Sequence, residues 1–215
     1  MKKLNRFIIY IIGMIILALG LSLSTKTKLG VSALTSFPYM LSEIYNLKFG
    51  DITLIYYIFL ILIEIILHII MKQKKIIIND ILSIFLSIIF TRGMNIFISF
   101  VPDIPNNYIY KILLMLLAII FIGVGISLTV VSKLVPNPAD GLVSTISEFT
   151  KKNMGLIKNI CDITCVTITV ILSLILKNKI IGVGIGTLMA MLLVGRVVYI
   201  FNKLFENKIK KFIGC

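Results

Sequence analysis

Six long apolar stretches constrain this chain more than any other feature of its sequence. Each approaches the ~20 residues that an α-helix needs to cross the hydrocarbon core of a bilayer. Lipid offers no partner for free backbone groups, and the stretches lack the alternation typical of barrel strands. We therefore predict an all-α membrane protein with six transmembrane helices, over residues 7–24, 52–71, 79–101, 112–132, 159–176 and 180–201.

The composition of the 215 residues supports this class. Hydrophobic residues make up 59% and charged residues 14% of the chain, whereas soluble domains have about 45–50% and 25%. A soluble globular domain, a disordered chain and a disulfide-stapled miniprotein are excluded. The first stretch follows basic residues as a signal peptide would, but no small-residue cleavage site follows it, so we predict a span.

The basic residues predict the orientation in the membrane. The chain has 22 Lys and Arg against nine Asp and Glu, a formal net charge of +13. With the N-terminus inside, fourteen basic residues fall in inner segments and six in outer ones, while Arg92 and Arg196 lie within spans. This asymmetry follows the positive-inside rule. We expect a bacterial plasma-membrane protein with both termini cytoplasmic, with the lipid bilayer and not nucleic acid as its partner.

The chain also matches itself when it is shifted by 105 positions. Between residues 20–50 and 125–155, eight of 31 aligned positions are identical, including Gly20 with Gly125. Each half, residues 1–104 and 105–215, holds three predicted spans. Because an odd number of spans reverses orientation, we expect one membrane domain of two inverted repeats, a plan common in secondary transporters.

A shorter segment follows the first span of each half, over residues 32–47 and 137–152. Ser32 and Asn137 are candidate N-caps, and Asn137 precedes Pro138 at the first helical position and Asp140 at the third. We predict short interfacial or re-entrant helices, with ordinary surface connections as the alternative. Helix N-termini near the midplane would present unpaired N–H groups to an anion or polar solute.

Polar residues share one helical face in the second and in the fifth span. In the second span, four of the five residues on this face are polar: Thr53, Tyr57, Glu64 and His68, with Leu60 as the fifth. The fifth span carries Lys158, Asp162, Cys165, Thr169 and Ser173. A charge facing lipid costs roughly 2.5–3.5 kcal/mol, so we expect both faces to point inward and both spans to be central. The interpretations are a packed interface, a solute or ion path, or a homo-oligomer contact.

Two charged pairs on these faces are one helical turn apart. Glu64 with His68 is a candidate proton relay, and Lys158 with Asp162 is predicted to form a structural salt bridge. The candidate path residues for a small-molecule solute or ion are therefore Ser32, Glu64, His68, Asn137, Asp140, Lys158, Asp162 and Thr169.

The sixth span opens with small residues, and we predict that Gly182, Gly186 and Ala190 form a helix-packing stripe. Phosphate-loop, nucleophile and zinc-ligand motifs are absent, and the chain has one His and three Cys. We therefore expect no catalytic residues, no metal, no cofactor and no enzymatic activity.

Several segments together resemble the YczE/YyaS/YitT-type family of bacterial membrane proteins. They are Ser36–Ser42, Pro136 with Gly141–Val143, Lys158–Asp162, Gly184–Thr187 and Leu193–Gly195. The resemblance implies a multi-span plasma-membrane protein and assigns no chemistry. Where the family often has Phe-Gly and then an Asp near the end of the third span, this chain has Phe90, Thr91 and Asn95.

Two functions are compatible with these features. The inverted repeat, the paired short helices and the matched polar faces favour a small-solute permease or transporter. The modest size and the few intramembrane charges favour a non-transporting accessory or regulatory protein that acts on a partner. A cavity between the second and fifth spans would favour the first function, and a packed interior would favour the second.

Overall fold

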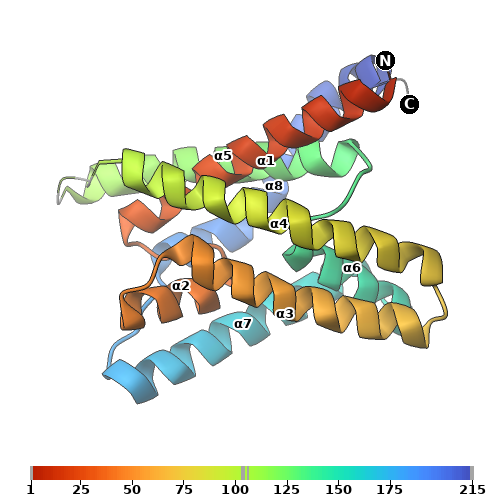
Figure 1. The fold of residues 1–215 in the computed structure, drawn as a ribbon. Helices are drawn as coiled ribbons and strands as arrows, with labels where there is room; N and C mark the ends of the chain where they lie inside the picture. The colour runs from red at the N-terminus through yellow and green to blue at the C-terminus, as the bar shows by residue number, and fades with distance from the viewer. Residues whose placement is uncertain (1, 103–104, 106, 214–215) are drawn as a thin grey trace.

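The computed structural model describes residues 2–102, 105 and 107–213, and Figure 1 shows its fold. Its helices are α1 (Lys2–Thr27), α2 (Ala33–Tyr45), α3 (Phe49–Ile70), α4 (Lys74–Phe100), α5 (Tyr108–Val131), α6 (Pro138–Thr150), α7 (Met154–Lys177) and α8 (Ile185–Ile213). The described residues contain no strand. All helices except α2 and α6 are long and apolar enough to cross a membrane, which confirms the expected all-α class with six candidate spans.

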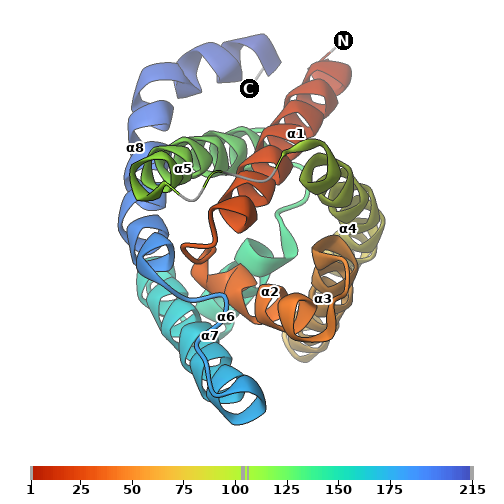
Figure 2. The same cartoon turned by 90° about the vertical axis from the view of Figure 1, so that its left-hand side faces the viewer.

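The two ends of the chain lie at the same end of the molecule. The Asn5 side-chain amide donates a hydrogen bond to the Phe212 carbonyl oxygen at 3.0 Å, and Figures 1 and 2 show both termini together. We call this end, which also holds residues 71–73 and 151–153, the terminal end. The distal end holds residues 46–48 and 178–184.

Helices α1 and α5 form the centre of the bundle, and glycines bring them together. A Cβ added at Gly125 of α5 would lie 2.6 Å from the Leu17 backbone nitrogen of α1. A Cβ at Gly20 would lie 2.8 Å from the backbone nitrogen of Ile122. These approaches exclude any larger side chain without displacement of a helix. The second and fifth predicted spans correspond to α3 and α7, and the expectation that they are central is wrong. Helices α1 and α5 are instead the most buried of the long helices.

Two long helices pack on this pair, and the other four helices lie to one side of it (Figure 2). Helix α4 packs against α1 and α3, and α8 packs against α5 (Figure 2). Short helix α6 lies along α3, and short helix α2 lies along α7. Along α6, Gly141 faces Glu64 and Thr145 contacts His68, so α6 starts beside the middle of α3 and runs toward the terminal end. This arrangement favours the re-entrant over the interfacial interpretation.

The predicted packing stripe at the start of the sixth span is only partly helical. Gly182 precedes α8 and has φ +84°, a conformation that favours glycine, and its carbonyl oxygen accepts a hydrogen bond from the Val31 N–H at 3.1 Å. Gly182 is therefore not part of a helical stripe. Gly186 and Ala190 are buried residues of α8, and the Gly186 N–H donates to the Leu29 carbonyl oxygen at 2.8 Å.

The α1–α5 contact predicts opposite effects of alanine at two helical glycines. Gly125→Ala should lower the free energy of unfolding by about 1–3 kcal/mol, because the added methyl overpacks the contact with Leu17. Gly93→Ala should raise it by up to about 1 kcal/mol, because a Cβ there has no neighbour within 4 Å and alanine favours the helix. Unfolding in mild detergent measures both. Equal effects would contradict the close packing.

Candidate functional site

The first turn of α6 positions the site inside the bundle. The Asn137 side chain caps α6 by accepting a hydrogen bond from the Ala139 N–H at 3.2 Å, and Pro138 occupies the first helical position. Ser32 is the N-cap residue of α2, although its side chain makes no capping hydrogen bond. Both predicted N-cap positions are confirmed.

Glu64 of α3 lies against this first turn of α6. The residue is only 4% exposed, and a Cβ on Gly141 would lie 2.6 Å from its Oε1 atom. Oε1 is buried and has no hydrogen-bond partner among the described residues. A buried carboxylate oxygen without a donor is costly. Protonation or a bound cation would remove that cost, and the positive end of the α6 dipole stabilises the charged form.

An ion pair joins α6 to α7. Lys158 Nζ donates to Asp140 Oδ1 at 3.0 Å. Asp162 is buried one turn further along α7, within electrostatic range of both charges. The predicted salt bridge of Lys158 with Asp162 is therefore replaced by one with Asp140, since α6 brings that carboxylate to the lysine.

His68 forms a second buried cluster toward the terminal end. Its Nδ1 atom lies 2.7 Å from Asp80 Oδ2 of α4, and its Nε2 atom lies 3.3 Å from the Thr145 hydroxyl of α6. Both ring nitrogens of His68 thus have partners other than Glu64, and the predicted Glu64–His68 pair is not formed. Sequence analysis missed Asp80, although a carboxylate within an apolar stretch is itself a signal.

The eight predicted path residues divide between the two short helices. Six of them gather around α6, namely Glu64, His68, Asn137, Asp140, Lys158 and Asp162. Ser32 and Thr169 belong to the α2 side, where the Thr169 and Ser36 hydroxyls lie 3.0 Å apart. Ser36 and Thr169 are the counterparts of Gly141 and Glu64 at a shift of 105. A hydrogen-bonded pair of hydroxyls in one half therefore corresponds in the other half to a buried carboxylate whose Oε1 atom has no partner among the described residues.

A small cleft reaches the N-terminus of α6. Its volume is about 20 Å³, and Tyr57, Ser87, Asn137 and Pro138 are among the residues that line it. This volume holds about one water molecule. The cleft is therefore large enough for a water molecule, but too small for an organic solute in this conformation.

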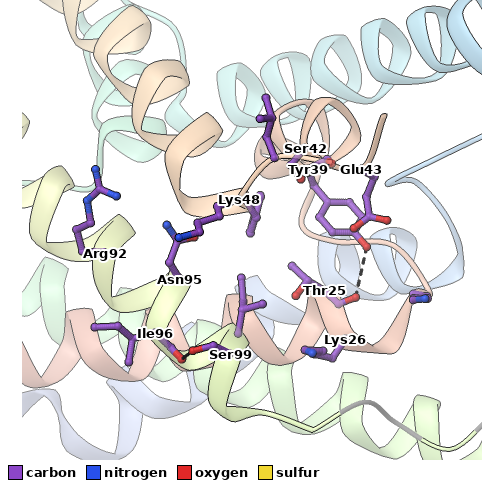
Figure 3. Close-up of a pocket in the computed structure, with 14 residues that line it drawn as sticks. Thr25, Lys26, Tyr39, Ser42, Glu43, Lys48, Arg92, Asn95, Ile96 and Ser99 are labelled. Atoms are coloured by element: carbon purple, nitrogen blue, oxygen red, sulfur yellow. Dashed lines mark hydrogen bonds between the residues drawn. The ribbon is translucent and has the colours of Figure 1, made fainter. Parts of the chain in front are cut away.

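A much larger pocket of about 650 Å³ opens at the distal end (Figure 3). Its lining comes from the ends of four helices and their connections: Thr25, Lys26, Lys28, Tyr39, Ser42, Glu43, Leu47, Lys48, Phe49, Arg92, Asn95, Ile96, Ile98 and Ser99. Sequence analysis missed this pocket, because no single segment carries a motif for it.

Arg92 and Asn95 have defined partners at one side of this pocket. Arg92 donates to Asp51 Oδ1 at 2.8 Å, and the Asn95 amide donates to the same oxygen at 2.9 Å. The Asn95 Oδ1 atom accepts a hydrogen bond from the Gly50 N–H at 2.8 Å. Asn95 thus joins α4 to the first turn of α3, and both its donor and its acceptor atoms are needed for this role.

Comparisons with known proteins add a family but no chemistry. Residues 4–203 match a family model described as "Family of unknown function (DUF6198)". The uncharacterized protein YyaS of Bacillus subtilis (strain 168) is 25% identical over 204 residues, which cover 94% of each chain. No solved structure gives a significant match.

The buried His68–Asp80 pair predicts a larger stability effect than a surface pair. Asp80→Ala should lower the free energy of unfolding by about 1–3 kcal/mol, because it leaves a buried imidazole nitrogen without a partner. Glu206→Ala, which removes the half-exposed pair with Lys210 one turn apart on α8, should cost less than about 0.5 kcal/mol. Denaturant titration in detergent compares the two; similar costs would contradict the buried pairing.

Proposed function

The chain belongs to the DUF6198 family of unknown function, and from this premise we propose that it is a small-solute permease. The expected resemblance to YyaS-type proteins is confirmed by the 25% identity to YyaS along most of the chain. The proposed location is the bacterial plasma membrane, with both termini cytoplasmic and the distal end outside. This orientation rests on the fourteen basic residues in inner segments against six in outer ones.

The helix boundaries support two inverted repeats as the framework of transport. Helices α2 and α6 begin at residues 33 and 138, and α3 and α7 begin at residues 49 and 154, each pair 105 positions apart. The contact of α2 with α7 has its counterpart in the contact of α6 with α3. Helices α1 and α5, also counterparts, meet at the centre, where a pseudo-two-fold axis would pass.

The unpartnered Glu64 carboxylate is the observation on which the proposal chiefly depends. A packed structural acid finds donors, whereas Glu64 Oε1 has none among the described residues and faces the first turn of a re-entrant helix. Intramembrane acids of this kind mark ion and proton paths. We infer that Glu64 binds the coupling proton or cation, and that Asp140, Lys158 and Asp162 contact the solute.

A non-transporting accessory protein is the second candidate, and the small cleft favours it. The cleft at the N-terminus of α6 has a volume of about 20 Å³, which is too small for an organic solute in this conformation. A permease must open this region by moving α6 or its neighbours, whereas an accessory protein would keep it closed. Transport activity separates the two functions.

The first functional prediction concerns Glu64. Glu64→Gln keeps the side-chain shape and removes its charge, so uptake into reconstituted vesicles should fall at least tenfold while insertion and folding are retained. Glu206→Gln on exposed α8 is the control and should leave uptake unchanged. The solute is identified beforehand by comparing metabolites in cells with and without the protein. Unchanged uptake in both Glu64→Gln and Asp162→Asn would favour the accessory function.

The second functional prediction concerns orientation. The hydrogen bond between Asn5 and Phe212 supports a shared side for both termini, and the distribution of basic residues favours the cytoplasm as that side. A reporter active only in the cytoplasm should work when it is fused after residue 213 and fail when it is inserted in the α4–α5 connection. The opposite pattern would reverse the proposed orientation.

A further inference from the structure

The distal pocket carries a charge pattern that the proposed function does not yet use. Four basic side chains line it, Lys26, Lys28, Lys48 and Arg92, together with a single acidic one, Glu43. Arg92 is paired with Asp51. Lys28 and Lys48 form no ion pair with any described residue, so their charges act on whatever enters the pocket.

The floor of the pocket supplies directional polar groups. The Tyr39 hydroxyl donates to the Thr25 carbonyl oxygen at 3.4 Å, and the Tyr39 ring packs edge-on against Phe49 at 5.5 Å between centroids. In Figure 3, Glu43 lies on the Tyr39 side of the pocket, and Lys48 points toward the Asn95 side. A solute would therefore meet a hydrogen-bond acceptor on one side and a cation on the other.

We propose that the distal pocket is the outer binding site for a small organic anion, a carboxylate or a phosphate ester, that also carries a hydrogen-bond donor. Lys28 and Lys48 attract the anionic group, and Glu43 accepts a hydrogen bond from the donor group. The volume of about 650 Å³ is within the range of small-molecule sites. The unpaired lysines also raise the local concentration of anions, an effect that salt screens.

This assignment rests on the proposed permease function for its biological role, but binding itself is measured without any uptake step. Loss of transport with binding retained would overturn the permease and leave the pocket assignment in place. A second source of the same chemistry is an anionic lipid headgroup, since Leu47 and Ile96 add apolar surface to the lining. A comparison of nanodiscs with and without an anionic lipid distinguishes binding of a free anion from binding of a lipid headgroup.

The test is calorimetric titration of the full-length protein in nanodiscs of phosphatidylcholine, with malate, whose hydroxyl is a hydrogen-bond donor, and inorganic phosphate as probes and choline chloride as the cationic control. The double variant Lys28→Gln/Lys48→Gln removes the two lining cations that form no ion pair with a described residue. The matched control is Lys177→Gln/Lys179→Gln, which makes the same charge change at the distal end outside the pocket lining. Thermal unfolding of each variant shows that folding is retained.

We expect saturable binding of at least one anionic probe and none of choline. The Kd should rise at least tenfold in Lys28→Gln/Lys48→Gln and less than twofold in the control, and nanodiscs with 30% phosphatidylglycerol should leave it unchanged. Absence of saturable binding of both probes would overturn the proposal. Equal weakening in the two double variants would do so as well, because it would indicate a general charge effect. Loss of probe binding in the phosphatidylglycerol nanodiscs would assign the pocket to a lipid headgroup instead.

Discussion

The close contact between α1 and α5 is the interaction on which the rest of the structure depends. Helices in lipid gain little from hydrophobic burial against one another, so they associate through van der Waals packing at small residues. Gly20 and Gly125 allow each backbone to approach the other helix, and the two glycines are counterparts in the repeat. Helices α4 and α8 pack on this pair from outside. The short helices occupy the remaining space beside α3 and α7.

Hydrogen bonding inside the bundle separates structural polar groups from candidate functional ones. Most buried hydroxyls are satisfied by a carbonyl three or four residues earlier in their own helix, as in Ser22 to Ala18 and Thr91 to Ser87. Such residues cost little in a membrane and require no partner. Glu64 cannot form such a hydrogen bond within its own helix, because an ionised carboxylate has no hydrogen to donate to a carbonyl. Its position against Gly141 is therefore consistent with the proton- or cation-binding role that we propose for it.

The sequence predicts those parts of the fold and site that depend on local patterns. The six spans follow from hydropathy, both short helices from their N-cap residues Ser32 and Asn137, and the inward faces of α3 and α7 from helical spacing. The ion-pair partners of Lys158 and His68 could not be predicted, because these partners lie on helices that are distant along the sequence.

The two corrected pairs illustrate the limit. Lys158 pairs with Asp140 and His68 with Asp80, although each has a carboxylate at helical spacing on its own helix. The tertiary contacts of α6 and α4 determine these pairs. The centrality of α1 and α5 depends likewise on backbone approach at glycines, which hydropathy does not report, and the distal pocket combines four helix ends.

In the permease that we propose, the two repeats would open the distal and terminal ends alternately around α1 and α5. Spin-label distances test it most directly in a variant with the native cysteines replaced by serine. One pair at residues 45 and 100 reports on the distal end, and its counterpart at 150 and 205 reports on the terminal end. The account predicts two distance populations for each pair, with weights that shift in opposite directions when Glu64→Gln is introduced. One narrow distance for both pairs, unchanged by Glu64→Gln, would contradict it.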